Sequence, residues 1–362
     1  MTEDRVIILG AGIIGLSLAL ELRLRGHDVL VLERGHATAQ ASSAAAGMLA
    51  ANDPENPSQL HALSHLSIQL YPDFLRRITS LSGIDIPIHT SLTLQRLELS
   101  SPQTDLQPKV ESLPLRSYLP SASQSAGHFV SLPEQSLDPR QLAASLLAAV
   151  RKANVDLRED VTVLSIEEQA EKSTIHTAQG TLHARTIVDC TGAWSGTTSG
   201  LPIQPVKGQM LRILMPPGIL DSANHGRIVV RTPEFYVVPR LNGTALIGAT
   251  VEDVGFDTVV DPQKLISLQQ SAAELLPSIA DQPIVESWAG LRPGTPDHLP
   301  LLGSLPNRTH QYIAAGHFRN GILLAPATAH VMADVIEGKI PSIDLSPFTP
   351  ARFTKHTADR TH

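Results

Sequence analysis

The chain has 362 residues, of which 42% are hydrophobic and 17% charged, and its net charge is −7. This composition is typical of a globular protein long enough for one large or two medium domains. The acidic balance argues against binding to nucleic acid or to an anionic membrane surface. Because Cys190 is the only cysteine, an intrachain disulfide and a cysteine-based metal site are excluded, and the 15 scattered histidines indicate no metal site either.

The chain also lacks the sequence patterns of membrane insertion and secretion. No apolar run reaches the roughly 18 residues that a membrane-spanning helix needs, so no span is expected. A strand-like run begins almost at once, without the charged and apolar regions of a signal peptide. We therefore predict a cytoplasmic location, which agrees with a single unpaired cysteine.

The first elements in chain order are predicted to be a strand, a helix and a second strand. Val6–Leu9 is an apolar run short enough for a buried parallel strand. An apolar-periodic helix follows from Ile14 to Arg25 and ends at Gly26. The second strand covers His27–Leu32. This order is typical of the beginning of a Rossmann-like α/β domain.

The turn between the first strand and the helix carries the G-x-G-x-x-G pattern as Gly10, Gly12 and Gly15. Gly10 allows the tight turn, Gly12 lets backbone N–H groups approach a pyrophosphate, and Gly15 lets the helix pack closely on the strand. Glu33, at the end of the second strand, can accept hydrogen bonds from a ribose hydroxyl. The pattern predicts a dinucleotide site, and the alternative is a glycine-tolerant packing turn.

The following segments alternate between helical and strand-like patterns. A small-residue stretch covers 37–48, and a helix interrupted by Pro72 covers 60–81. Asp138, as N-cap, and Pro139, at the first helical position, begin an amphipathic helix that runs to Lys152. A further helix is predicted at Pro262–Leu276. Short strands are predicted at Ser91–Leu99, Val155–Leu157, Val161–Ile166, Ser173–Thr177, Leu182–Ala184, Thr186–Cys190, Phe235–Val238 and Thr244–Ile247.

These patterns predict an α/β fold in which a Rossmann-like domain is joined to a second, β-rich (α+β) substrate domain. The dinucleotide-binding domain is discontinuous and consists of 1–81, 138–203 and 286–345. The substrate domain consists of two β-rich inserts, 82–137 and 204–285. Low periodicity predicts a loose tail at 346–362.

A second strand–glycine–helix unit near the end of the chain favours FAD over NAD. Tyr312–Ala315 is a buried strand, Gly316–Gly321 is a loop with the sequence GHFRNG, and a helix runs from about Ile322 to Glu337. An enzyme that uses free NAD does not need this second helix start. In a flavoprotein, the positive N-terminus of the helix can face the negative charge of the reduced flavin. The alternative is an ordinary strand–helix loop.

Six further segments, together with the glycine-rich start, carry a resemblance to a known family. They are SSAAAGM (42–48), VKGQM (206–210), FYVVPR (235–240), LIGAT (246–250), WAGLRPGTPD (288–297) and AAGHFRNGILLAPAT (314–328). With these segments the chain resembles the D-amino acid oxidase family of FAD enzymes, most closely its glycine oxidases, which serve thiamine thiazole synthesis. The resemblance extends from residue 6 to about 338, whereas 84–135 contributes little.

The resemblance implies positions for the cofactor. Glu33 and Arg34 would hold the adenosine ribose, and Val163 would offer its backbone to the adenine. Residues along the pyrophosphate and flavin would be Ser42, Ser43, Ala46, Gly47 and Met48, with Ile14 and Gly192 in the same set. Residues around the isoalloxazine would be His317, Phe318, Arg319, Asn320, Gly321, Ile322 and Leu323.

The resemblance also implies how substrate is held. Arg292 would bind a carboxylate, because a planar guanidinium can form two parallel hydrogen bonds with it. Tyr236 would add one hydrogen bond, and Arg319 would lie near the substrate. The alternatives are an ion-pairing or surface role for Arg292, a sheet-core role for Tyr236, and a structural role for Arg319.

Two departures and one absence qualify the resemblance. Family glycine oxidases have His and Met where this chain has Glu234 and Val251, which puts the substrate profile in doubt but not the reaction class. In sarcosine oxidases with covalent flavin, a cysteine follows the Arg-Pro of the C-terminal motif. Here Gly294 follows Arg292-Pro293, so non-covalent FAD is predicted.

The function implied is oxidative deamination of glycine, or of a small amine such as sarcosine or D-alanine, with O₂ as electron acceptor. The products would be the imine or glyoxylate, ammonia and H₂O₂, and orientation of the substrate would be the main catalytic effect. The alternatives are a D-amino acid or sarcosine oxidase or dehydrogenase with another acceptor and, more remotely, a non-catalytic flavin-binding interaction protein. The family suggests a homotetramer.

Overall fold

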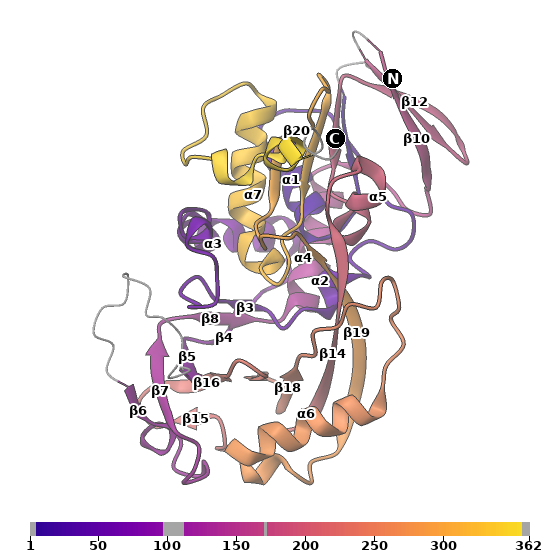
Figure 1. The fold of residues 1–362 in the computed structure, drawn as a ribbon. Helices are drawn as coiled ribbons and strands as arrows, with labels where there is room; N and C mark the ends of the chain where they lie inside the picture. The colour runs from indigo at the N-terminus through magenta and orange to yellow at the C-terminus, as the bar shows by residue number, and fades with distance from the viewer. Residues whose placement is uncertain (1–4, 97–111, 170–171, 357–362) are drawn as a thin grey trace.

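The computed structural model describes residues 5–96, 112–169 and 172–356. Figure 1 shows an upper part in which helices cover a sheet, and a lower part dominated by one large sheet. The predicted strand Ser91–Leu99 is observed as β5 (Leu92–Arg96), and its last three residues lie outside the described residues.

The centre of the upper part is a six-stranded sheet that contains the predicted N-terminal strand. Neighbouring strands are parallel except for one antiparallel edge pair, β20 with β21. The predicted strand pair β1 and β2 therefore lies inside the sheet, as a Rossmann-like unit requires. The strand order is β20 (Leu301–Ser304), β21 (Gln311–Ala315), β13 (Thr186–Asp189), β1 (Val6–Leu9), β2 (Val29–Leu32) and β9 (Asp156–Arg158).

Side chains alternate along β1 between two different layers. Val6 and Ile8 pack against helices, namely α1 (Ile13–Leu24), α3 (His61–Ser82), α4 (Pro139–Lys152) and α7 (Gly321–Ile336). Ile7 and Leu9 pack against a small antiparallel sheet of β10 (Val163–Glu168), β11 (Ser173–Thr177) and β12 (Gly180–Ala184). The sheet that carries the glycine-rich turn is thus covered on both faces.

Helix α4 begins as the sequence predicts. The Asp138 carboxylate accepts a hydrogen bond from the Arg140 backbone N–H at 2.9 Å, and Pro139 occupies the first turn. The prediction that Pro72 interrupts its helix is wrong, because α3 continues unbroken through this residue. Pro72 is exposed, so water can satisfy the carbonyl that loses its helical partner, while Tyr71 and Phe74 hold the buried side of the helix in place.

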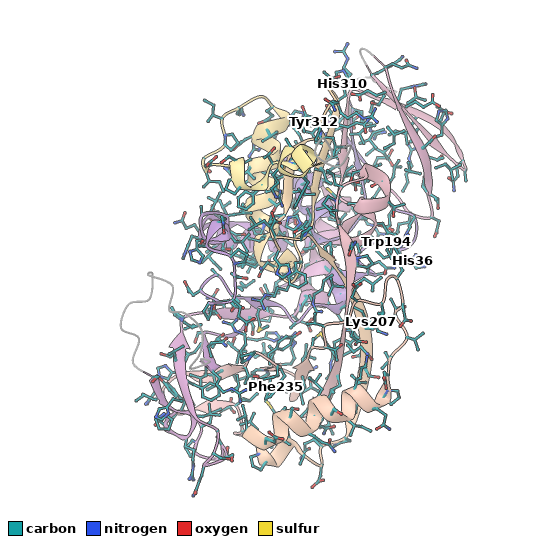
Figure 2. The ribbon with its side chains drawn as sticks, viewed as in Figure 1. His36, Trp194, Lys207, Phe235, His310 and Tyr312 are labelled. Carbon is teal, nitrogen blue, oxygen red and sulfur yellow. The ribbon has the colours of Figure 1, made fainter. Side chains whose placement is uncertain are left out.

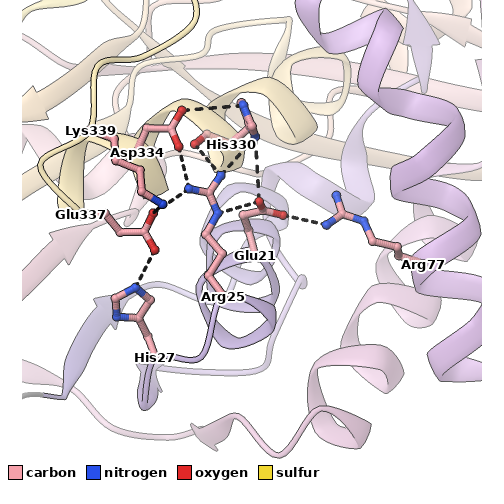
Figure 3. Close-up of polar contacts among 8 residues, drawn as sticks. All are labelled: Glu21, Arg25, His27, Arg77, His330, Asp334, Glu337 and Lys339. Atoms are coloured by element: carbon pink, nitrogen blue, oxygen red, sulfur yellow. Dashed lines mark hydrogen bonds and ion pairs between the residues drawn. The ribbon is translucent and has the colours of Figure 1, made fainter.

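A network of charged side chains joins α1, α3 and α7 (Figure 3). Arg25, at the end of α1, pairs with Glu21 at 2.9 Å, with Asp334 at 2.6 Å and with Glu337 at 2.9 Å. Arg77 of α3 pairs with Glu21 at 2.9 Å. Partial burial lowers the pKa of Arg25, but these carboxylates outweigh it and raise the pKa overall. The network ties together three helices of the upper part.

The lower part is one large sheet built from three separate segments of the chain. All neighbouring strands in it are antiparallel except β16 and β5. The two inserts predicted to form a substrate domain therefore pair with each other. The strand order is β19 (Ile284–Gly294), β14 (Gln204–Leu214), β18 (Thr244–Gly248), β17 (Tyr236–Pro239), β16 (Gly226–Arg231), β5, β7 (His128–Leu132) and β6 (Ser112–Pro114), with β15 (Asp221–Ser222) on β16.

The large sheet has two different faces. One face packs on α6 (Pro262–Leu275) through residues that include Leu211, Val237 and Ile247. The other face carries Met210 and Tyr236, which point toward the upper part. This alternation leaves one face of the large sheet free to form the wall of a cavity.

Short elements and the long strands β14 and β19 connect the upper and lower parts. A small sheet of β3 (Met48–Leu49), β8 (Gln135–Leu137) and β4 (Ile88–Thr90) lies between them, next to α2 (Ala41–Ala44), and α5 (Ser195–Ser199) follows β13 (Figure 1). Strand β19 crosses the predicted boundary at residue 286, because it pairs with β14 along most of its length.

The beginning of the predicted loose tail is packed. Two 3-10 helices cover Ser346–Phe348 and Pro350–His356, and Phe348 is fully buried. Arg352 forms an ion pair with Asp297 at 2.8 Å. Low hydrophobic periodicity was a poor guide here, because one aromatic side chain and one ion pair hold a segment without regular repeats.

Candidate active site

A cavity of about 480 Å³ lies between the upper sheet and the free face of the large sheet. This volume falls within the roughly 300–1,000 Å³ typical of ligand sites. The cavity brings together 19 of the predicted site residues: Gly10, Gly12, Ile14, Glu33, Arg34, Ser42, Ala46, Gly47, Met48, Val163, Gly192, Tyr236, Arg292, His317, Phe318, Arg319, Asn320, Gly321 and Ile322.

Three predicted cofactor residues do not line this cavity. Gly15 lies in the first turns of α1, where a side chain would collide with the Gly10 carbonyl, so it has the packing role that the sequence predicts. The Ser43 hydroxyl donates to the Thr38 carbonyl at 2.7 Å. Leu323 is buried in α7, and its carbonyl accepts a hydrogen bond from the Ser67 hydroxyl at 2.6 Å.

The glycine-rich turn has no space for a side chain at Gly10. Gly10 has a left-handed φ of +95°, and a methyl group on it would lie 2.6 Å from the Cys190 carbonyl oxygen. The Ile13 N–H, in the first turn of α1, donates to the Ser42 hydroxyl at 2.8 Å. The start of α1 and the small-residue stretch thus form one continuous wall, whose N–H groups suit an anion.

The end of β2 supplies a carboxylate to the same wall. Glu33 accepts hydrogen bonds from the Ala11 N–H at 2.8 Å and from the Gly35 N–H at 3.0 Å. Next to it, the Arg34 guanidinium lies 3.8 Å from the ring centre of Trp194. Trp194, labelled in Figure 2, lines the cavity but was not predicted as a site residue, although it ends the segment Thr191–Trp194 that follows β13.

The loop before α7 forms the opposite wall. The His317 imidazole contacts the Thr328 hydroxyl at 3.0 Å, and burial lowers its pKa to about 3, so the ring is neutral at pH 7. Phe318, with a φ of +46°, stacks on His298 with ring centres 4.6 Å apart. The Phe318 N–H donates to the Pro293 carbonyl at 2.8 Å, which joins this loop to β19.

Arg292 and Tyr236 come from two strands of the large sheet and point into the cavity. Arg292 Nη1 donates to the Thr250 carbonyl at 3.1 Å. Tyr236 Oη lies 3.5 Å from Met210 Sδ. Burial raises the pKa of Tyr236, although Arg292 lowers it, so the phenol is protonated at neutral pH and can donate a hydrogen bond. A cation with several N–H donors and a neutral hydroxyl therefore share one region of the wall.

A cluster of charged side chains lies beside this pair, and three of them, Asp53, Glu134 and Arg231, are buried. Arg231 forms ion pairs with Glu134 at 3.1 Å and with Asp53 at 3.6 Å. Arg319 pairs with Glu55 at 2.6 Å and with Asp53 at 3.4 Å. Burial raises the pKa of Glu134, although Arg231 lowers it. These ion pairs agree with the alternative, structural role for Arg319.

Sequence analysis missed Asp53 and Arg231, both of which line the cavity. They stand outside every quoted segment and become neighbours only when the large sheet forms, so no local pattern signals them. Of the two residues expected to depart from the family, Glu234 lines the cavity and pairs with Arg96 at 2.5 Å. Val251 also lines it and is 71% exposed.

Cys190 is buried at the glycine-rich turn, and burial raises the pKa of its thiol. No group of three or more His, Cys, Asp or Glu side chains within 5–96, 112–169 and 172–356 could hold a metal ion. Over the same ranges, no helix is both long and apolar enough to cross a bilayer.

Comparison with known proteins identifies the fold family. The FAD dependent oxidoreductase (DAO) family matches residues 5–335. A glycine oxidase of Pseudomonas aeruginosa is 35% identical over 96% of this chain and 99% of its own length. A bifunctional protein ThiO/ThiG of Trichormus variabilis is also 35% identical over 99% of this chain, which spans 56% of that longer protein.

A solved structure agrees with these sequence matches. The crystal structure of glycine oxidase from Geobacillus kaustophilus superposes with a TM-score of 0.87 at 32% identity, covering 96% of this chain and 99% of that one. The sequence prediction of a Rossmann-like FAD-binding fold with a second domain is confirmed. The chain belongs to the DAO family of FAD-dependent oxidoreductases and is an FAD-dependent enzyme.

Proposed function

We propose that this enzyme oxidatively deaminates glycine or a small relative such as sarcosine or D-alanine. In the overall reaction, glycine, O₂ and water give glyoxylate, ammonia and H₂O₂. The observation that carries the proposal is the pairing of Arg292 with Tyr236 in the same cavity as the dinucleotide signature. The similarity to glycine oxidases supports glycine as the substrate.

The residues of the cavity fit a non-covalent FAD. A side chain at Gly10 would fill the turn below the start of α1, as the Cys190 carbonyl contact shows. Glu33 would hold the ribose, Ser42 and the first turn of α1 the pyrophosphate, and the loop 317–322 the isoalloxazine. When bound, FAD supplies the two-electron acceptor for the amine.

Arg292 and Tyr236 would bind and orient the substrate. The guanidinium has five N–H donors, and the hydrogen bond to Thr250 uses one, so donors remain for a bidentate carboxylate. The Tyr236 hydroxyl would donate to the same carboxylate. With the carboxylate fixed at two points, the α-carbon has fewer accessible orientations, which lowers the entropic cost of the reaction. Neutral His317 would place no positive charge beside the amine.

The substrate range depends on the other charged side chains that line the cavity. Glu234 replaces a family histidine and brings a carboxylate to the cavity, although Arg96 partly neutralises it. An added carboxylate disfavours substrates with a second negative charge. We therefore place glycine, sarcosine and D-alanine ahead of dicarboxylate amines.

The test is an amine screen on purified protein, with H₂O₂ release measured in parallel with dye reduction. H₂O₂ formed in step with glycine loss supports an oxidase. Dye reduction without H₂O₂ would indicate a dehydrogenase, and turnover with neither glycine nor its small relatives would contradict the proposal. A cytoplasmic homotetramer that passes its imine to thiazole synthesis stays a prediction, and light scattering tests the oligomeric state.

A further inference from the structure

Gly208 occupies a place in β14 where a side chain would collide with Arg292. A methyl group on Gly208 would lie 2.5 Å from Arg292 Cζ and closer still to both terminal nitrogens. In the β14–β19 pair, Gly208 is opposite Gly290, and Arg292 is two residues further along β19. Arg292 is therefore a diagonal neighbour on the same face, and its guanidinium extends across the strand to lie on the bare backbone of Gly208.

The guanidinium is also fixed from the side. Arg292 Nη1 donates to the Thr250 carbonyl at 3.1 Å. Thr250 is itself held, because its hydroxyl accepts from the Gln209 N–H at 2.8 Å and donates to Glu252 at 2.6 Å. The guanidinium cannot move off Gly208 without stretching this hydrogen bond, so the position of its free edge depends on both contacts.

The same arrangement recurs at the second side chain of the pair. Gly248 in β18 is directly opposite Tyr236 in β17. A methyl group on Gly248 would lie 2.6 Å from Tyr236 Oη and 2.7 Å from Cζ. Two glycines on one face of the sheet thus leave the space in which the guanidinium and the phenol lie.

We propose that Gly208 is a positioning residue for substrate, and that Gly248 plays the same part for Tyr236. Gly208 sets the height of the Arg292 guanidinium above the sheet and thereby the place of the substrate carboxylate. This inference rests on the proposed role of Arg292 as the carboxylate anchor.

A methyl group on Gly208 is expected to change the position of Arg292 without impairing folding. The three atoms nearest to a methyl group on Gly208 all belong to the tip of Arg292, which is a flexible side chain. Gly208 is not among the residues with a left-handed φ, so alanine fits its backbone. Alanine also reduces the freedom of the unfolded chain, which favours folding. Gly208→Ala should therefore displace Arg292 while FAD content and Tm stay near wild type.

The experiment compares Gly208→Ala, Arg292→Ala and the double variant in the FAD-loaded enzyme. Gly208→Ala should lower kcat/KM for glycine about tenfold or more, a change equivalent to at least about 1.4 kcal/mol. The affinity for acetate, measured from the change in flavin absorbance, should fall by a similar factor. In the Arg292→Ala background the same substitution should have little further effect, because the group it displaces is gone.

Gly290→Ala is the contrasting control, since its methyl group would meet Ala44 and not Arg292. Any decrease in kcat/KM that Gly290→Ala causes in the wild-type enzyme should therefore also be found in the Arg292→Ala background. Wild-type glycine kinetics and acetate affinity in Gly208→Ala, with Arg292→Ala impaired, would overturn this inference alone. If Arg292→Ala also behaves as wild type, the proposed role of Arg292 fails with it.

A second measurement covers the case in which Gly208→Ala does not fold. Recovery of folded, FAD-loaded protein on adding Arg292→Ala would support the predicted collision, because the double variant removes the guanidinium. Failure of the double variant to fold would overturn the inference, since the cost would then come from another contact.

Discussion

Replacing Arg292 with alanine should reduce kcat/KM for glycine by about 30- to 150-fold. The proposed carboxylate pair is charge-assisted, and truncating one partner of such a pair costs about 2–3 kcal/mol, within the range found for partly buried ion pairs. Each 1.36 kcal/mol corresponds to about tenfold in rate. Arg292→Lys should recover only part of the loss, because an ammonium cannot form the two parallel hydrogen bonds.

The assay is steady-state H₂O₂ release with glycine and with a small amine that lacks a carboxylate. In Arg292→Ala, kcat/KM for this amine should decrease far less than kcat/KM for glycine, since the amine has no group for Arg292 to bind. Arg227→Ala is a matched control, because Arg227 lies on β16, pairs with Asp221 at 3.8 Å and is absent from the cavity wall. Wild-type glycine kinetics in Arg292→Ala, at full FAD occupancy, would show that another residue holds the carboxylate.

Three further predictions concern the cofactor and pH. The purified protein should be yellow and release FAD on acid precipitation, because no cysteine follows Arg292-Pro293; flavin in the pellet would disprove non-covalent binding. Glu33→Ala should weaken FAD retention, since a charge-assisted hydrogen bond to ribose is worth about 1.5–3 kcal/mol, and equilibrium dialysis against FAD measures it. Burial lowers the pKa of His89 to about 4, with Arg240 contributing, and that of His317 to about 3. As the pH falls from about 6.5 to 4, these two histidines bind protons in the unfolded chain but not in the folded protein. The free energy of unfolding should therefore decrease over this pH range, and urea titrations at several pH values can check it.

Local chemistry made the glycine-rich turn and the start of α4 predictable. The turn at Gly10 and the packing of Gly15 follow from steric demands that only glycine meets, so the sequence signals them directly. The cap at Asp138 is equally local, because donor and acceptor lie two residues apart. Predictions of this kind need no knowledge of the tertiary structure.

Features that depend on distant partners were not predictable in the same way. Asp53 and Arg231 come together only because β16 joins the large sheet beside the upper part. Pro72 is tolerated because its side of α3 faces solvent, which the proline itself does not reveal. Phe348 is buried by tertiary packing within a segment of low periodicity. Burial by distant segments explains each of these differences.

Strand β19 links the two ends of the cavity more directly than the predicted domain boundary suggested. Arg292 lies near its end, and the next residue, Pro293, accepts the hydrogen bond from the Phe318 N–H at 2.8 Å. Phe318 belongs to the loop that leads into α7, the loop proposed to contact the flavin. One peptide unit therefore separates the residue proposed to hold the carboxylate from a backbone contact to the cofactor wall. The Phe318–Pro293 hydrogen bond therefore ties the loop proposed to contact the flavin directly to the strand that carries the proposed substrate anchor.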